Sequence, residues 1–258
     1  MKRLQLVELE DLSWFPPLLR NYMTDFLRTI EEKTDLFGPA VDTIAGLLES
    51  NGQSAVVDLA SGGGGQWRTL FPRLATRVAN ARLTLTDYYP NHDSLKRIAA
   101  IDQQAVAVES DSVDARQVPD HLHGVRTMFL SLHHFNPEDA TKILADAVSA
   151  KAPIAVFEAQ LRDFKHLIQF AISPLAVLAL TPFIRPFSLG RLFFTYLAPV
   201  VPLCVGFDGV ASVFRTYMPD ELLEMAAVAD PGGSYEWSAK VVSHGLHKVQ
   251  IFTGQPRV

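Results

Sequence analysis

Residues 56–67 read VVDLASGGGGQW: an apolar run, Asp58, two small residues, four consecutive glycines and a polar–aromatic pair. The chain has 15 glycines in all, so four together are a local feature. Glycine has no Cβ, so a turn built on glycines leaves its backbone N–H groups open to a ligand. The stretch therefore predicts a strand ending near Asp58, a ligand-binding turn, and a helix over 66–77.

Outward from this turn, short apolar runs alternate with stretches of helical periodicity. Strands are predicted within 81–87, 105–110, 125–132, 152–159, 234–242 and 247–254, and helices over 91–101, 136–150 and 218–230. Alternating strands and helices predict a mostly parallel sheet covered by helices.

The alternation divides the chain into four regions. Residues 1–52 carry apolar side chains at helical spacing and predict an N-terminal helical cap. Residues 53–160 form the ligand-binding core. Residues 161–217 interrupt it as an apolar helical insertion. Residues 218–258 contribute the last helix and a strand pair that completes the core.

Composition excludes several classes of protein. The chain has 258 residues, a net charge of −5 and no basic run, so the electrostatic footprint of a nucleic-acid binder is missing. Cys204 is the one cysteine, which excludes a disulfide framework. The first residues lack the apolar core of a signal peptide, so we expect a cytoplasmic protein.

The acid before the glycines separates two ligand classes. Read from Ala60, the stretch matches Ala-x-Gly-x-x-Gly, a partial dinucleotide fingerprint. The carboxylate of Asp58 would repel a pyrophosphate, whereas a sulfonium ligand that carries an ammonium group is compatible with it.

The stretch resembles the first motif of class I methyltransferases that use S-adenosylmethionine, Asp/Glu-x-Gly-x-Gly-x-Gly. That motif falls on Asp58, Ala60, Gly62 and Gly64, and Ala60 departs from it at the first glycine. The resemblance covers residues 54–160 well and the C-terminal strand pair weakly. It implies an α/β, Rossmann-like fold with a seven-stranded, mostly parallel sheet whose last strand is antiparallel.

The resemblance also implies where the cofactor, S-adenosylmethionine, is held. Asp87 closes the second strand, 23 residues after Gly64, where the family places the acid that binds the ribose hydroxyls. Tyr88 could lie beside the adenine, and a side chain after the third strand, Asp114 in preference to Asp111, could receive the adenine amino group. The expected cofactor-binding residues are Asp58, Ala60, Ser61, Gly62, Gly63, Gly64, Asp87, Tyr88, Asp114, Ala115 and Ser131.

Two histidines follow the fourth strand in the sequence LHHF, which resembles the small-molecule branch of the family. His133 and His134 are the candidates for a general base, since imidazole titrates near neutral pH, and the sequence does not choose between them. Glu158 ends the fifth strand and is expected to bind substrate or to form an ion pair. Arg215 either binds an acidic group of the acceptor or pairs with Asp208. No metal site is expected.

The insertion is almost free of charge between residues 165 and 207. Three interpretations compete: a lid over an apolar acceptor site, a peripheral membrane contact, and a homodimer interface. Several prolines interrupt the apolar runs and argue against two straight membrane spans. We favour the lid.

Together these features predict methyl transfer from S-adenosylmethionine to a small, hydrophobic acceptor. Two alternatives remain at this point: an NAD-dependent oxidoreductase, and a non-catalytic, membrane-associated protein that retains a methyltransferase-like fold.

Overall fold

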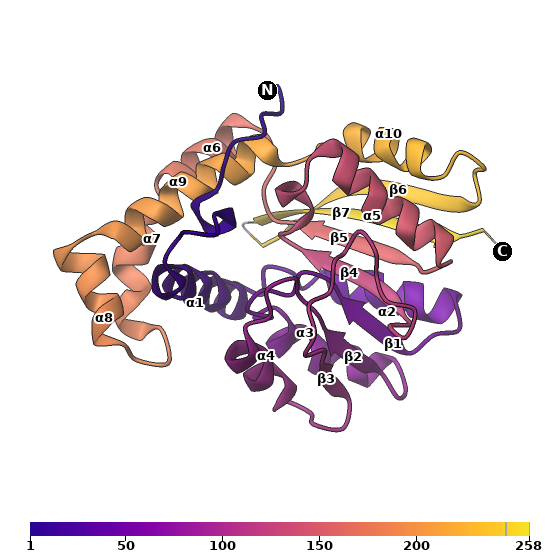
Figure 1. The fold of residues 1–258 in the computed structure, drawn as a ribbon, viewed down its shortest axis with the longest axis horizontal. Coiled ribbons are helices and arrows are strands. Elements are labelled where there is room, and N and C mark those ends of the chain that lie inside the picture. Colours follow the sequence, from indigo (N-terminus) through magenta and orange to yellow (C-terminus); the bar gives the residue numbers. More distant parts are fainter. Residues whose placement is uncertain (246, 258) are drawn as a thin grey trace.

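The structure, a computed structural model, describes residues 1–245 and 247–257. Its centre is one seven-stranded sheet with the order β3-β2-β1-β4-β5-β7-β6 (Figure 1). The strands are β1 (Ala55–Asp58), β2 (Arg82–Leu85), β3 (Val106–Val108), β4 (Val125–Phe129), β5 (Ile154–Glu158), β6 (Tyr235–His244) and β7 (His247–Pro256). Strands β1 to β5 pair in parallel, and β7 is antiparallel to both of its neighbours. The predicted fold class is confirmed.

Both faces of the sheet are covered, because successive strand residues point to opposite sides. Val56 packs in one core with α2 (Ala40–Ser50), α3 (Trp67–Arg77) and α4 (His92–Ala99). Val57 packs in a second core with α5 (Pro137–Ser149) and α10 (Pro219–Ala229). With both faces filled, the carboxyl ends of the parallel strands are the place where a fold of this kind binds ligands.

Local sequence signals set the starts of the core helices. At the start of α5 the side chain of Asn136 accepts a hydrogen bond from the Asp139 N–H at 2.9 Å, and Pro137 occupies the first helical position. These are the residue types that cap and begin helices, because proline has no N–H to leave unsatisfied there.

The N-terminal region is only partly the helical cap that its periodicity predicts. Helix α1 (Pro17–Thr34) and α2 are present, but residues 1–16 hold only the short 3-10 helix η1 (Leu9–Asp11). Residues distant in the sequence accept hydrogen bonds from the backbone of this segment instead. The Leu4 N–H donates to Phe214 O, and the carboxylate of Asp208 accepts from the N–H groups of Leu9 and Glu10. The expectation of a helical segment here was wrong, because tertiary partners replaced the helical hydrogen bonds.

The insertion folds into helices that form a lobe beside the sheet, on the far side of α1 (Figure 1). Its elements are α6 (Phe164–Ala171), α7 (Ser173–Leu180), η3 (Thr181–Phe183), α8 (Leu189–Leu192), the π-helical turn η4 (Phe193–Leu197) and α9 (Val200–Arg215). A third apolar core joins the lobe to α1, and Arg191 binds Asp25 of α1 at 2.7 Å. The lobe is thus attached to the core through α1.

The outer surface of this lobe, residues 164–207, is unusually apolar. Its exposed large apolar side chains are Phe164, Ile168, Ile172, Leu175, Phe183, Phe187, Leu189, Phe193, Tyr196, Leu197, Leu203 and Phe207. By length and composition, the 20 residues Phe164–Phe183 could cross a membrane. The second apolar run, Leu189–Leu197 with Val200–Arg215, is bent by 75° and is not one straight span.

Candidate functional site

The glycine turn after β1 adopts the left-handed backbone at three alternate positions. The φ angles are 54° at Ala60, 54° at Gly62 and 63° at Gly64. These are the positions at which the motif requires glycine, because left-handed φ is strained for a residue with a Cβ. Ala60 adopts the conformation of the glycine it replaces, so the turn keeps its shape despite the departure from the motif.

The four consecutive glycines serve two different purposes. Gly63 and Gly65 allow α1 to approach: a Cβ on Gly63 would lie 2.8 Å from Thr24 Cγ2, and one on Gly65 would lie 2.9 Å from Arg28 Cα. A Cβ on Gly62 would meet nothing within 4 Å. The turn is therefore pressed against α1 on one side and presents open backbone at Gly62.

Asp87 lies beside this open backbone, as the sequence predicts. Its Oδ2 accepts a hydrogen bond from the Gly62 N–H at 2.8 Å, and its Oδ1 accepts one from the Tyr89 N–H at 2.8 Å. β2 ends at Leu85, earlier than expected, which places Asp87 in the loop above the strand end. The half-exposed Tyr88 follows it.

Asp58 lies beneath the turn and is fully buried. Its Oδ1 accepts a hydrogen bond from the Thr127 hydroxyl at 2.7 Å, and its Oδ2 has no partner. Burial raises the pKa of Asp58 to about 7. Burial, and then the neighbouring Glu32, also raise the pKa of Glu31 on α1 to about 7. These two neighbouring carboxyls, together with the unpartnered Oδ2 of Asp58, form a site that suits a cation.

Two serines were also expected to bind the cofactor, and their contacts differ. The Ser61 hydroxyl donates to Asp58 O at 3.0 Å and accepts from the Thr86 N–H at 3.2 Å, so it stabilises the turn itself. Ser131 is buried and its Oγ has no partner.

The segment after β3 packs against the Asp87 loop. The Val113 N–H donates to Asp87 O at 3.0 Å, and Ala115 is buried. The carboxylate of Asp114, however, pairs with Arg116 at 2.7 Å, and this hydrogen bond lowers the pKa of Asp114. Asp114 is therefore near the expected adenine site but already has a partner.

A cavity of about 470 Å³ lies between α1, the ends of β4 and β5, and helices α6, α7 and α9. Its lining is mainly apolar and includes Met23, Phe26, Leu130 and Phe170. The cavity's size is within the range of small-molecule pockets. Helices of the lobe thus form one side of the cavity, and the role of a lid over an acceptor stays a prediction.

His133 lines this cavity and belongs to a buried hydrogen-bonded pair with Glu158. Its Nδ1 lies 2.9 Å from Glu158 Oε2, and its backbone N–H donates to Glu158 Oε1 at 3.2 Å. Because a carboxylate can only accept, we assign the proton to Nδ1, which leaves Nε2 as the basic nitrogen. Gln160, which the sequence analysis did not identify, donates from its amide to Glu158 Oε2 at 3.2 Å.

His134 also lines the cavity, but carboxylates surround its ring and favour the charged form. Its Nδ1 lies 2.8 Å from Asp11 Oδ1. Burial opposes a charge on this ring, but the carboxylates of Glu8, Asp11 and Glu10 outweigh burial and raise the pKa of His134 to about 10. A pKa this high keeps His134 protonated at neutral pH in this arrangement, which argues against a role as the base. The surroundings of the two histidines therefore differ, and the catalytic role of either one stays a prediction.

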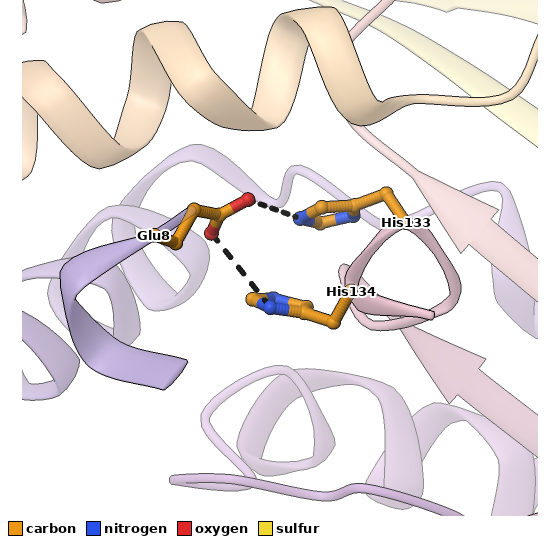
Figure 2. Close-up of side chains that lie close together, drawn as sticks. All are labelled: Glu8, His133 and His134. Carbon is orange, nitrogen blue, oxygen red and sulfur yellow. Dashed lines mark ion pairs between the residues drawn. The ribbon is translucent and has the colours of Figure 1, made fainter. Parts of the chain in front are cut away.

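Glu8 completes this cluster from the N-terminal segment (Figure 2). Its oxygens lie 3.8 Å from His133 Nε2 and 3.7 Å from His134 Nδ1, and Arg215 Nη1 lies 3.3 Å from Oε1. One ligand atom from each of Glu8, His133 and His134 lies within 4.8 Å of the others, which is close enough for a metal ion. Since Arg215 and the His134 proton already balance the charge, we interpret the cluster as an ion-pair network, and the absence of a metal stays a prediction.

The two residues expected to bind substrate have structural partners instead. Glu158 is buried rather than at the pocket rim and holds His133. Arg215 is buried, donates to the backbone carbonyl oxygens of His133 and His134, and pairs with Asp11 and Glu8. It does not pair with Asp208, whose carboxylate caps the N-terminal segment. Both residues position the histidines.

No family model matches the sequence, and no curated protein matches it. Solved structures share the fold at low identity. The O-methyltransferase NcsB1 from neocarzinostatin biosynthesis, solved with S-adenosyl-L-homocysteine and 1,4-dihydroxy-2-naphthoic acid, is 16% identical with a TM-score of 0.54, over 93% of this chain and 59% of that one. PigF with S-adenosyl-homocysteine is 15% identical with a TM-score of 0.53, over 95% and 62%. This chain spans about three fifths of their length and has the class I methyltransferase fold.

Proposed function

We propose that this chain transfers a methyl group from S-adenosylmethionine to a hydroxyl of a small, largely apolar acceptor. The observation that carries the proposal is His133, which lines a mainly apolar cavity at the same sheet edge as the glycine turn and is held by the buried Glu158. A base of this kind is needed when the acceptor must lose a proton before or during methyl transfer.

The residues around the glycine turn fit the cofactor. Asp87 is positioned for the ribose hydroxyls, because its carboxylate lies at the open backbone of Gly62. Asp58 and Glu31 provide two carboxyls for the cofactor's ammonium group, and the unpartnered Oδ2 of Asp58 is a buried acceptor that this ammonium would satisfy. The bound cofactor supplies an electrophilic methyl on a sulfonium.

The remaining chemistry belongs to the chain. His133 Nε2 accepts the acceptor's hydroxyl proton, while Glu158 holds the Nδ1 proton and stabilises the imidazolium that forms. The protonated His134 lines the same cavity and attracts the negative charge that develops on the acceptor oxygen. The apolar walls exclude water and orient the acceptor.

A ligand bound in one of the similar solved structures supports a small, largely apolar acceptor. NcsB1 was solved in complex with 1,4-dihydroxy-2-naphthoic acid, which is a small aromatic molecule. The mainly apolar lining of the cavity in this chain suits a molecule of that polarity.

Two measurements test the proposal. Calorimetry should show binding of S-adenosylmethionine, whereas quenching of NADH fluorescence would favour the oxidoreductase. Labelled methyl from the cofactor should enter a component of aqueous or lipid extracts, and any such turnover excludes the non-catalytic alternative. His133→Ala should lower the rate at saturating substrate roughly 10²- to 10⁴-fold, with cofactor affinity unchanged. If this variant kept full activity, the assigned base would be wrong.

A further inference from the structure

The outer surface of the insertion lobe (residues 164–207) concentrates the exposed apolar side chains of the protein. Twelve of the 23 exposed large apolar residues in the described chain lie in these 44 of 258 residues. Phe164 and Ile168 of α6, and Ile172 at its C-cap, recur every four residues, so they lie along one face of this segment. Leu203 and Phe207 repeat this spacing on α9. Exposed apolar side chains concentrated in this way mark interaction sites.

The charges of the lobe are as distinctive as its apolar surface. Residues 164–207 contain no aspartate or glutamate, although the whole chain has 28. The lysines and arginines of this segment are Lys165, Arg185 and Arg191. Arg191 is buried against Asp25, whereas Lys165 and Arg185 are exposed. The exposed surface of the lobe is therefore apolar and cationic on a protein whose net charge is −5.

This charge pattern favours a lipid surface over a second copy of the chain. In a two-fold dimer the lobe would meet itself. Lys165 and Arg185 would then face an identical surface that offers no carboxylate from this segment. The phosphates of anionic lipids, in contrast, attract each such cation by about 1 kcal/mol.

Packing against α1 indicates a lobe that lies on the bilayer rather than one that crosses it. Val177 and Ile184 are fully buried in the core that joins the lobe to α1. A spanning orientation of 164–183 would pull α1, with Arg28 and Glu31, into the hydrocarbon region, and burying those charges is costly. An amphipathic arrangement with one face in the protein and one in the interface avoids that cost.

We propose that the insertion lobe docks on the surface of a lipid bilayer that contains anionic lipids. Its apolar side chains enter the boundary between headgroups and acyl chains, and Lys165 and Arg185 contact the phosphates. Ile172 and Leu175 both line the cavity and are exposed on the lobe, so the cavity meets the docking surface. The acceptor then enters from the lipid phase, a step that rests on the proposed function.

Co-sedimentation with vesicles tests the docking without any activity measurement. The full chain should bind vesicles of equal parts phosphatidylcholine and phosphatidylglycerol. The double variant Leu189→Glu with Leu197→Glu should bind them roughly 100-fold more weakly, since each leucine contributes more than a tenfold gain when buried. Val228→Glu on α10 is the matched control, because Val228 is 71% exposed and Leu189 is 75% exposed. It should bind like the unchanged chain.

The second arm tests the charges. Lys165→Gln with Arg185→Gln should reduce the preference for anionic over pure phosphatidylcholine vesicles about tenfold or more. The proposal is overturned if the unchanged chain binds neither kind of vesicle. It is equally overturned if ultracentrifugation shows a dimer that the double glutamate variant dissociates while vesicles remain unbound. Turnover of a soluble acceptor by a chain that ignores vesicles would refute docking and leave the proposed function intact.

Discussion

Replacement of Ala60 by glycine tests whether the glycine turn carries measurable strain. Ala60 has a φ of 54°, in the left-handed region, where a residue with a Cβ is disfavoured by about 1–2 kcal/mol. Glycine removes this penalty but gives the unfolded chain more freedom, which offsets about 0.5–1 kcal/mol. We therefore expect Ala60→Gly to raise the free energy of unfolding by about 0.5–1 kcal/mol. The midpoint of thermal unfolding should rise by roughly 1–4 °C.

Urea unfolding in the absence of cofactor measures this change in the free energy of unfolding. Two other substitutions by glycine serve as controls. Lys151 also has a left-handed φ, 51°, and is exposed at the end of α5, so Lys151→Gly should show a similar gain. Ala179 is exposed in the right-handed helix α7, and Ala179→Gly should lose about 1 kcal/mol.

The result that refutes the reasoning is a loss of stability in Ala60→Gly similar to that of Ala179→Gly. That outcome would mean that the Ala60 methyl contributes packing worth more than the backbone strain. If the reasoning holds, cofactor affinity in Ala60→Gly should be unchanged or tighter, because the turn becomes easier to hold in its binding conformation.

Three further predictions concern the same site. Asp87→Asn should weaken cofactor binding roughly 30- to 150-fold by calorimetry, the loss of about 2–3 kcal/mol in charged hydrogen bonds to the ribose; unchanged affinity would show that Asp87 serves only the turn. Cofactor affinity should rise as pH increases through about 7, because Asp58 and Glu31 then become charged toward the ammonium, and a flat profile would exclude them. Because the pKa values of these two carboxyls are raised in the folded state, the folded chain binds more protons than the unfolded chain between about pH 4 and pH 7. The contribution of Asp58 and Glu31 to the free energy of unfolding should therefore fall as the pH rises through this range, as measured by urea titrations. Gly65→Ala should destabilise the protein by about 1–3 kcal/mol, since its Cβ would lie 2.9 Å from Arg28 Cα; a neutral effect would show that α1 can move away.

The sequence was sufficient where the signal is periodic or short in range. Alternation of apolar runs predicted the sheet, because strand and helix periods follow from backbone geometry alone. The glycine turn and Asp87 were recognisable because a strand, a turn and a nearby acid form a local pattern. In the structure the Gly62 N–H donates to Asp87 at 2.8 Å, while the role of Asp87 toward the ribose stays a prediction.

The sequence misled where distant residues replaced local interactions. Residues 1–16 were expected to be part of a helical cap, yet Phe214 and Asp208 satisfy their backbone groups. Glu8 carried no motif and was not identified, although it is buried between the two histidines. Such partners cannot be found from spacing, because the segments meet only in the folded chain.

The sequence alone therefore determined the fold class and the place of the glycine turn. Only the tertiary structure gave the two histidines different surroundings. Asp11 lies 123 residues before His134 and 2.8 Å from its ring, and Glu158 holds the neighbouring His133. The protonation of an imidazole depends on the charges within a few ångströms and on burial, and both are set by the fold rather than by neighbouring letters.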